Sequence, residues 1–328
     1  MTVDAAKLII KKAIDSVDAP YNSIDIQFMG GEPLMQFDLI REVSEWLWNL
    51  DLKIPIESLS APTNGTLLND KMRQWFTANK HRFSLQLSFD GDRLMQNMNR
   101  SESSSLIDLD FFAQTFPDDG VKMTLSPQTI GQFYHGVKYL HEQGFKMVGA
   151  NLAYGANIGW EQKHLAILND ELDKLVDYYS EHTDLQPIGL LEIPVWNILD
   201  KDTPDMSCKC GRNVTCYDYD GQIYPCHIFS PITLSYEKAQ QAKDIDFEYV
   251  KSHNDTVCST CLLRKMCIKC YGINFRDRGN CNSQNSFDCA QYKLFFYASC
   301  KLHRRLAIIK DDKERVLIID KIVNLLKN

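Results

Sequence analysis

Four cysteines lie within thirteen residues in the back third of the chain, in the stretch CSTCLLRKMCIKC. They form two close pairs, Cys258 with Cys261 and Cys267 with Cys270, each with two residues between its members. Closely spaced thiolates can hold one metal ion or one iron–sulfur cluster from a short loop. Two C-x2-C pairs are also the pattern of a zinc ribbon, so the spacing alone leaves zinc and iron–sulfur both open.

The other cysteines supply more thiols than one zinc ion uses. The chain has eleven cysteines, and none of them precedes Cys208. An odd number cannot be fully paired in disulfides, and clustered thiols in a reducing compartment indicate bound metal. Two four-iron clusters would use roughly seven or eight of them, which favours iron–sulfur over zinc. The seven cysteines outside the first stretch are Cys208, Cys210, Cys216, Cys226, Cys281, Cys289 and Cys300.

The stretch CYDYDGQIYPCH reads as a β-hairpin with a two-residue turn at 220–221. That turn would place Thr215 opposite Cys226. Because side chains alternate along a strand, Cys216 would then point away from Cys226. We therefore do not expect Cys216 to share a metal site with Cys226.

A second group of residues suited to ligand binding lies in the first 100 residues, at the ends of predicted strands. In SIDIQFMGGEP a strand ends in two glycines, an acid and a proline, and such glycines let the backbone approach a ligand. In parallel α/β folds, ligands bind at the carboxyl ends of the strands. APTNGTLL and LSFDGDRLMQNMNR place further polar residues at the next two strand ends. The candidate positions are Gly30, Gly31, Glu32, Pro33, Thr63, Asn64, Ser88, Asp90 and Arg100.

An alternation of strand and helix patterns would position these residues. Short apolar strands separated by helices predict βαβ units and a parallel sheet. Right-handed crossovers then favour a barrel or a doubly wound sheet. The predicted strands are 23–29, 54–61, 83–89, 121–126, 145–154 and 189–196, and the predicted helices are 36–49, 69–79, 106–114, 130–142 and 160–182, after an amphipathic N-terminal helix.

The chain changes character near residue 197. From there to about residue 289 it is polar, turn-rich and cysteine-rich, and reads as loops with one hairpin. From Ser286 to Asn328 the pattern is helical again. The length of 328 residues and the apolar content of 44% are sufficient for a buried core.

The overall charge and hydropathy argue against two classes of partner. A net charge of −7 argues against an overall basic nucleic-acid-binding protein. The chain has no run of about 18 apolar residues that would predict a membrane span. Its first twenty residues carry Lys and Asp where a signal peptide has an apolar core. We therefore predict a cytoplasmic protein with no nucleic-acid and no membrane partner.

The cysteine stretches CKCG, DGQIYPCH, CSTCLLRKMCIKCYG and CAQYKLFF together resemble the SPASM domain. That domain extends many radical S-adenosylmethionine (SAM) enzymes and holds two auxiliary [4Fe-4S] clusters. Gly221 matches the glycine of the family pattern, and Cys270 comes one residue earlier than that pattern has it. The resemblance implies an outer cluster on Cys258, Cys261, Cys267 and Cys289, and an inner cluster on Cys208, Cys226 and Cys270, with Cys210 or an open site as the fourth ligand. Cys281 and Cys300 match no family position.

The front half resembles the SAM-binding barrel of the same enzymes. Their GGEP motif, matched by 30–33, contacts the amino group of SAM's methionine moiety, and Asn64, Ser88, Asp90 and Arg100 fall where the family surrounds SAM and its ribose. The resemblance implies an α/β fold: a partial (β/α)6 TIM-like barrel missing its first strand over 1–196, a SPASM domain over 197–300 and a C-terminal helix over 301–328.

Three later residues have two open interpretations. Asn151, Tyr154 and Trp160 follow or end a predicted strand of the barrel. They line the substrate side in one interpretation, and belong to core or loop packing in the other.

The family's defining C-x3-C-x2-C motif has no counterpart in the first 207 residues. In the family, its three thiolates hold the cluster that cleaves SAM. We therefore expect the chain as given not to cleave SAM alone, and a third [4Fe-4S] cluster only where the missing segment is supplied. Three explanations are open: an N-terminally truncated sequence, a degraded pseudoenzyme, or a loop supplied by a separate polypeptide. Intact SAM-contacting motifs favour the first.

The resemblance also implies a class of reaction. SPASM enzymes are mostly peptide and protein modifiers, so we expect a peptide maturase that modifies or crosslinks a ribosomal peptide. Its partners would be a precursor peptide or protein and a reductase such as flavodoxin or ferredoxin. His227 follows Cys226 where the sulfatase-maturing branch has a basic Asp, and is either a proton acceptor or a hydrogen-bonded hairpin residue. The alternatives are an iron–sulfur electron-transfer or peptide-binding remnant, and a zinc-stabilised structural module.

Overall fold

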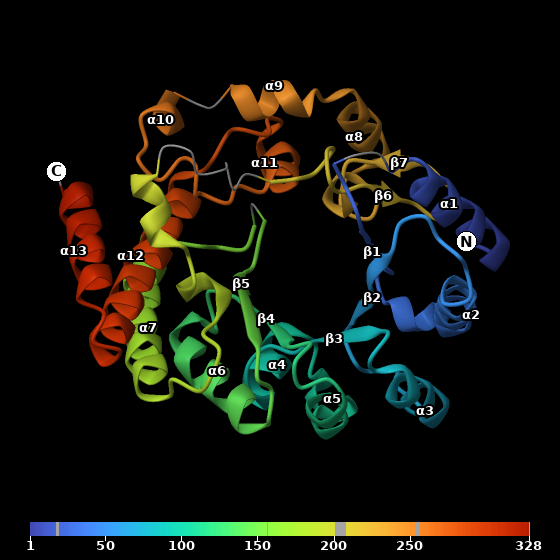
Figure 1. The fold of residues 1–328 in the computed structure, drawn as a ribbon, viewed down its shortest axis with the longest axis horizontal. Helices are drawn as coiled ribbons and strands as arrows, with labels where there is room; N and C mark the ends of the chain where they lie inside the picture. Colours follow the sequence, from blue (N-terminus) through green and yellow to red (C-terminus); the bar gives the residue numbers. More distant parts are fainter. Residues whose placement is uncertain (18–19, 156, 201–207, 254–255, 328) are drawn as a thin grey trace.

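Five parallel strands form a curled sheet in the computed structural model, which describes residues 1–17, 20–155, 157–200, 208–253 and 256–327. The strands follow one another in chain order, and each pairs with the next in parallel. Figure 1 shows the sheet as an open arc, which confirms the predicted α/β fold with a partial TIM-like barrel. The strands are β1 (Ile24–Gln27), β2 (Ile56–Thr63), β3 (Ser84–Ser88), β4 (Val121–Leu125) and β5 (Val148–Leu152).

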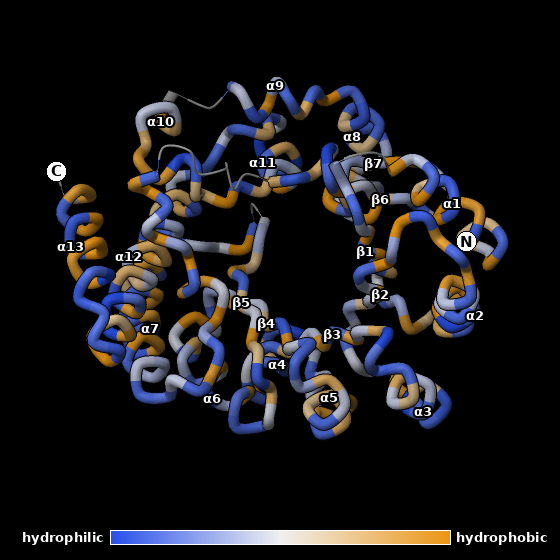
Figure 2. Tube along the Cα trace, in the orientation of Figure 1, coloured by the Kyte–Doolittle hydropathy of each residue, from blue (hydrophilic) through white to orange (hydrophobic). Residues whose placement is uncertain are grey.

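Helices cover the outer side of this arc, and the cysteine-rich segment lies across its open side (Figure 1). The helices of the front half are α1 (Val3–Asp15), α2 (Phe37–Leu47), α3 (Asp70–Asn79), α4 (Arg93–Asn99), α5 (Leu109–Thr115), α6 (Phe133–Glu142) and α7 (Gln162–Glu181). Short 3-10 helices add η1 (Pro33–Gln36), η2 (Ser103–Leu106) and η3 (Ile130–Gln132). Along α7 the tube in Figure 2 alternates between hydrophilic and hydrophobic residues, as expected for a helix with one buried face.

The two faces of the sheet differ in chemistry because side chains alternate along each strand. The outer face, under the helices, carries mainly apolar residues that are buried, such as Leu59, Leu85 and Met123. The inner face carries mainly polar side chains. The inner-face residues are Asp25, Gln27, Ser58, Ser60, Pro62, Ser84, Gln86, Ser88, Lys122, Thr124, Gly149 and Asn151.

The predicted strand at 189–196 is wrong. The segment forms two 3-10 helices instead, η4 (Gly189–Leu191) and η5 (Val195–Leu199). Its apolar residues are buried as expected of a core segment, but Pro194 lacks the backbone N–H that a ladder requires.

Helix α12 (Ser286–Ile309) takes the hydrogen bonds that a neighbouring strand would have made. The Ser299 hydroxyl donates to the Leu190 carbonyl at 3.2 Å, and the His303 ring bonds the Ile193 carbonyl at 3.1 Å. Two backbone carbonyls of this buried segment are therefore satisfied by helix side chains.

The cysteine-rich segment contains more helix than the predicted loops. A two-stranded hairpin, β6 (Cys216–Tyr217) with β7 (Ile223–Tyr224), is present as predicted. The segment also has the short helices η6 (His227–Phe229), α8 (Tyr236–Gln241), η7 (Ala242–Asp244), α9 (Phe247–Ser252), α10 (Thr256–Ser259) and α11 (Tyr271–Arg278).

Helices α12 and α13 (Lys313–Lys327) end the chain, and α12 packs along α7 of the barrel. Lys301 of α12 pairs with Asp173 of α7 at 2.6 Å, and Arg305 pairs with Asp177 one turn further on. The predicted boundary between 300 and 301 thus falls inside the continuous helix α12. Among the described residues, no helix combines the length and the apolar character that crossing a membrane needs.

Candidate cofactor and cluster site

The carboxylate of Glu32 joins the ends of β1 and β2. Its Oε1 accepts hydrogen bonds from the Thr63 hydroxyl at 2.8 Å and from the Leu34 backbone N–H at 3.0 Å. Its Oε2 accepts a bond from the Asn64 backbone N–H at 2.8 Å. These bonds bring the residues around 30–33 and 63–64 together at the carboxyl edge of the sheet, where parallel α/β folds bind ligands.

Gly30 and Gly31 face open space beside this carboxylate. A Cβ atom added to either glycine would meet no atom within 4 Å, and neither residue needs a left-handed φ. Neither backbone conformation nor packing inside the chain therefore requires glycine here. Direct approach of a ligand to the backbone is the remaining physical reason for the pair, and it fits the expected SAM contact.

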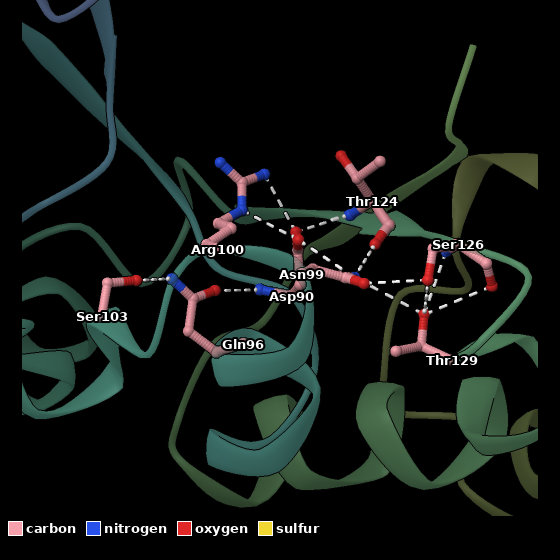
Figure 3. Close-up of polar contacts among 8 residues, drawn as sticks. All are labelled: Asp90, Gln96, Asn99, Arg100, Ser103, Thr124, Ser126 and Thr129. Carbon is pink, nitrogen blue, oxygen red and sulfur yellow. Dashed lines mark hydrogen bonds and ion pairs between the residues drawn. The ribbon is translucent and has the colours of Figure 1, made fainter. Parts of the chain in front are cut away.

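Asp90 and Arg100 form a two-pronged ion pair beyond the end of β3 (Figure 3). The Arg100 Nε donates to one Asp90 carboxylate oxygen at 2.8 Å, and its Nη2 donates to the other at 3.0 Å. The Thr124 backbone N–H and the Asn99 amide also donate to this carboxylate, at 2.7 and 3.2 Å. Asp90 is only 1% exposed, so it holds Arg100 in place and has no oxygen left facing solvent.

A network around this pair, which the sequence did not reveal, fixes α4 to the sheet (Figure 3). The Gln96 side chain accepts from the Asp90 backbone N–H at 2.8 Å and donates to Ser103 at 2.9 Å. The Asn99 amide accepts from the Ser126 hydroxyl at 2.9 Å. The hydrogen-bond partners of the run QNMNR after Asp90 lie up to 30 residues away in the chain, so the run alone could not reveal them.

Ser88 ends β3 on the inner face, directly beside Lys122 of β4. It is half-buried, and its hydroxyl makes no hydrogen bond to other described residues. The Lys122 Nζ lies 3.3 Å from the side-chain oxygen of Asn151 when that amide is oriented to donate to the Ala150 carbonyl. Asn151, one of the three residues with two open interpretations, therefore lies on the inner face of the sheet, as the substrate-side interpretation requires.

Trp160 and Tyr154 differ in their surroundings. The Trp160 Nε1 donates to the Ala153 carbonyl at 2.9 Å, and its ring stacks on Phe287 of α12 with centroids 5.3 Å apart. These contacts favour the packing interpretation for Trp160. Tyr154 is 48% exposed, and its pKa is raised by partial burial and by the nearby charges of Cys270 and Asp288.

The first thiol group consists of Cys208, Cys210, Cys226 and Cys270. Hydrogen bonding to the Cys210 side chain lowers the pKa of Cys208 to about 6 and also lowers that of Cys226. The same two hydrogen bonds, together with burial, raise the pKa of Cys210. Burial, followed by the charges of Cys208 and Cys226, raises the pKa of Cys270. These interactions place the four cysteines near one another, and their role as ligands of the inner cluster stays a prediction.

The second thiol group consists of Cys258, Cys261, Cys267 and Cys289. Burial raises the pKa of Cys267 to about 12, against the opposing charge of Lys269, and the charges of the other three thiols add to the increase. Cys267 thus lies near each of the other three cysteines, and the role of the four as ligands of the outer cluster stays a prediction. None of the eleven cysteines forms a disulfide.

Three cysteines lie outside the predicted ligand sets. Burial raises the pKa of Cys281 to about 11, and the charges of Cys208 and Cys270 contribute, which places Cys281 beside the first thiol group. Cys300 is buried in α12, in the core. In the part of the chain that the structure describes, no three His, Cys, Asp or Glu side chains are arranged to hold a single metal ion.

The predicted hairpin register is wrong by one residue. Cys216 pairs with Tyr224, and the loop has three residues that end in Gly221 with a φ of +82°. Cys226 follows Tyr224 by two residues in extended backbone, so Cys216 lies on the same face as Cys226. Burial raises the pKa of Cys216 to about 11, and the charge of Cys226 contributes.

His227 faces the barrel from the cysteine-rich half. Burial lowers its pKa, and the charge of Lys122 on the inner face of the sheet lowers it further. Its carbonyl accepts from the Ser230 hydroxyl at 2.8 Å, but its ring makes no hydrogen bond to other described residues. The local structure after the hairpin therefore uses the backbone carbonyl of His227 and not its imidazole.

Comparisons with known proteins give matches to solved structures only. No family model matches the sequence, and no curated protein sequence matches it. The native sulfatase-maturating enzyme anSMEcpe with bound AdoMet and Cp18Cys peptide is similar at 18% identity, with a TM-score of 0.69, over 95% of this chain and 92% of that one. Streptococcus suis SuiB bound to its precursor peptide SuiA is similar at 14% identity, with a TM-score of 0.56, over 88% and 69% of the chains.

The chain has the fold of radical SAM enzymes with a SPASM extension. SuiB bound to S-adenosylmethionine matches in the same way, at 15% identity and a TM-score of 0.57. The match to anSMEcpe extends over both halves of the chain, so it includes the cysteine-rich segment as well as the curled sheet. The fold expected from the sequence motifs is therefore confirmed.

Proposed function

We propose that this chain is a radical SAM/SPASM peptide maturase, which binds SAM at the carboxyl ends of its strands and two [4Fe-4S] clusters in its cysteine-rich half. The observation that supports it most directly is the separation of eight cysteines into two groups opposite a strand edge that gathers three polar motifs. Solved structures of the same fold carry AdoMet and peptides such as Cp18Cys and SuiA.

The strand-end residues divide into two roles in this proposal. Gly30 and Gly31 offer open backbone, and Ser88 and Arg100 offer hydrogen-bond donors, to the methionine and ribose parts of SAM. Glu32 and Asp90 are positioning residues, because their carboxylates are largely engaged by neighbouring backbone and side chains. Asn64 supplies its backbone N–H to Glu32, and Pro33 begins η1.

The thiol groups would hold the clusters, which supply electron transfer when bound. Cys258, Cys261, Cys267 and Cys289 would hold the outer one. Cys208, Cys210, Cys226 and Cys270 would hold the inner one, and Cys216 and Cys281 lie beside that set. Burial favours the neutral thiol at Cys267 and Cys270, so the positive charge of bound iron would be needed to keep these two deprotonated.

In this proposal the residues described above bind SAM but do not cleave it. Without a cysteine in the first 207 residues, the chain lacks the three thiolates of a SAM-cleaving cluster. We propose that a third [4Fe-4S] cluster forms only with thiolates from elsewhere. A precursor peptide, and a reductase such as flavodoxin or ferredoxin, would be the partners, and the cytoplasm the location.

Anaerobic reconstitution with iron and sulfide tests the proposal. We expect about eight irons per chain and a brown absorbance near 400 nm, as two four-iron clusters require. The double variant Cys258→Ser/Cys261→Ser should lose about half of the iron, whereas Cys300→Ser should lose none. Colourless protein that carries zinc would instead establish a structural zinc module.

A second measurement addresses the cofactor itself. Calorimetry should show SAM binding to the reconstituted chain, weakened by Arg100→Met, and incubation with SAM and dithionite should yield no 5′-deoxyadenosine. Substantial 5′-deoxyadenosine from the chain alone would contradict the proposal that cleavage needs thiolates from elsewhere.

A further inference from the structure

Lys122 is unusual among the inner-face residues of the sheet. It lies between Ser88 of β3 and Gly149 of β5 in the parallel register. The inner-face residues of β2, β3 and β5 are uncharged, and Asp25 at the outermost strand bonds the Ser58 hydroxyl at 2.5 Å. Lys122 is therefore the single cation that the described strands place on this face.

The side chain of Lys122 extends toward the carboxyl edge of the sheet. Its stem passes Gly149, where an added Cβ would lie 3.8 Å from the Lys122 Cγ. Its Nζ ends 3.3 Å from the Asn151 side-chain oxygen, two residues further along β5. Its charge also reaches His227 in the cysteine-rich half. The ammonium group thus lies on the side of the sheet that faces the proposed cofactors.

No carboxylate within the described residues lies within ion-pair distance of Lys122, which is exposed. The two carboxylates of the strand edge are engaged elsewhere, because Asp90 bonds Arg100 and Glu32 bonds Thr63. An ammonium group has three donors, and Asn151 accepts one of them. The remaining donors are available to an anion that enters from outside the chain.

We propose that Lys122, oriented by Asn151, binds a carboxylate of the peptide substrate, so that the chain selects peptides with an aspartate or glutamate near the modified residue. This inference rests on the proposed function and names its substrate class. A peptide carboxylate is favoured over the carboxylate of SAM because Arg100, beyond the end of β3, already supplies a cation at the carboxyl edge of the sheet where the open glycine backbone also lies.

Selection from a random dodecapeptide library with blocked termini tests the inference on the reconstituted full chain. Blocked termini ensure that any carboxylate comes from a side chain. We expect enrichment of Asp or Glu with the unmodified chain and with Lys122→Arg, and no such enrichment with Lys122→Gln. Lys146→Gln, which removes an exposed lysine after α6, is the matched control and should keep the enrichment.

An enriched acidic peptide and its Asp→Asn or Glu→Gln counterpart then give the size of the effect. A hydrogen bond to a charged group predicts binding about tenfold weaker for the amide peptide. That tenfold difference should disappear in Lys122→Gln. Preference for acidic peptides that persists in Lys122→Gln would overturn the inference.

The outcomes separate this inference from the proposed function. Peptides enriched without an acidic residue would refute the role of Lys122 and leave a peptide maturase standing. Failure to bind any peptide would refute the peptide substrate and the inference together. A loss of SAM affinity in Lys122→Gln, measured by calorimetry without peptide, would assign the lysine to the cofactor and overturn the inference.

Discussion

Arg100 is held in a fixed direction by a carboxylate that solvent hardly reaches. Asp90 receives donors from Arg100, Thr124 and Asn99, so the side chains of α4 and the backbone of β4 converge on one acid. A flexible arginine would lose conformational entropy on binding a ligand, whereas this one is already ordered. The buried acid thus prepares the guanidinium for a ligand.

Replacing Asp90 with Asn should destabilise the protein strongly. The change leaves the guanidinium without its charge partner and the buried donors with a weaker acceptor, which predicts a loss of about 3 kcal/mol in the free energy of unfolding. Urea denaturation measures it. Asp38→Asn removes an acid from an exposed pair with Lys71 and should have no measurable effect. Equal effects of the two changes would contradict the structural role of Asp90.

The stability of the fold should fall on mild acidification because of His141. Its ring bonds the Phe145 carbonyl and the Tyr179 hydroxyl, each at 2.9 Å, and burial lowers its pKa. A lowered folded-state pKa means that the stabilising contribution is complete above the pKa of the unfolded histidine, about 6.5, and is lost as the pH falls below it.

Thermal unfolding between pH 7.5 and pH 5 tests this expectation. His141→Asn should flatten the fall in the melting temperature, whereas His81→Asn, which changes an exposed histidine, should leave it unaltered. An unchanged slope in His141→Asn would exclude this residue as the source.

The sequence identified the strand-end residues but not which of them face outward. Glu32 and Asp90 stand in the expected positions, yet each is engaged by residues from other strands, namely Thr63 and Thr124. Such bonds depend on how neighbouring strands are aligned. A sequence pattern within one segment does not predict how its strand is aligned with the neighbouring strand.

Helix α4 is the front-half helix that no periodic pattern predicted, and it depends on a close backbone approach. Asp92 caps its first turn by accepting from the Met95 backbone N–H at 2.8 Å. Gly91, just before it, has a φ of +75°, and an added Cβ would lie 3.1 Å from the Cα of Gly136 in α6. The two glycines therefore allow the turn to rest directly on α6.

Substituting Gly91 with Ala should disrupt this contact. The left-handed φ and the clash with Met95 and Gly136 together predict a loss of about 3 kcal/mol. Gly189→Ala is the matched control, because its Cβ would meet nothing within 4 Å and its φ is not left-handed. Chemical denaturation should show a change within about 0.5 kcal/mol for the control. Similar values for both variants would disprove the close approach.

Element type was predictable where one periodicity extended over several residues. Five of the six predicted strands are present, because their apolar positions alternate with polar ones that face inward. The segment 189–196 failed because burial alone does not make a strand when helix α12 supplies the hydrogen bonds. The predicted hairpin register was wrong by one residue because Gly221 ends a three-residue loop. An Asp-Gly pair is compatible with such a loop as well as with the two-residue turn that was predicted.

The whole molecule has two hydrophobic cores of unequal size. The large one fills the space between the sheet and its helices, and the small one lies under the cysteine-rich segment. Three of the ten buried residues in the small core, Cys210, Cys226 and Cys281, are thiols. A core of this size with so much sulfur has little apolar surface to stabilise it, so bound clusters would contribute to its folding.

Removal of iron should therefore loosen one half of the molecule only. Limited trypsin digestion with mass spectrometry should show cleavage within 208–285 after anaerobic chelation, while 20–200 stays protected in both states. The Lys and Arg residues of both halves provide comparable cleavage sites, which serves as the internal control. Equal protection of the cysteine-rich segment with and without iron would show that its fold does not depend on clusters.

Cys267 belongs to one thiol group and Cys270 to the other, with Ile268 and Lys269 between them. Lys269 is only 4% exposed, so this short link is anchored inside the protein and does not swing freely. Filling one set of thiols would thus help to order its neighbour, so that each cluster would favour the binding of the other without being required for it. Residues 267–270 would also give electrons a short through-bond route from one cluster to the other.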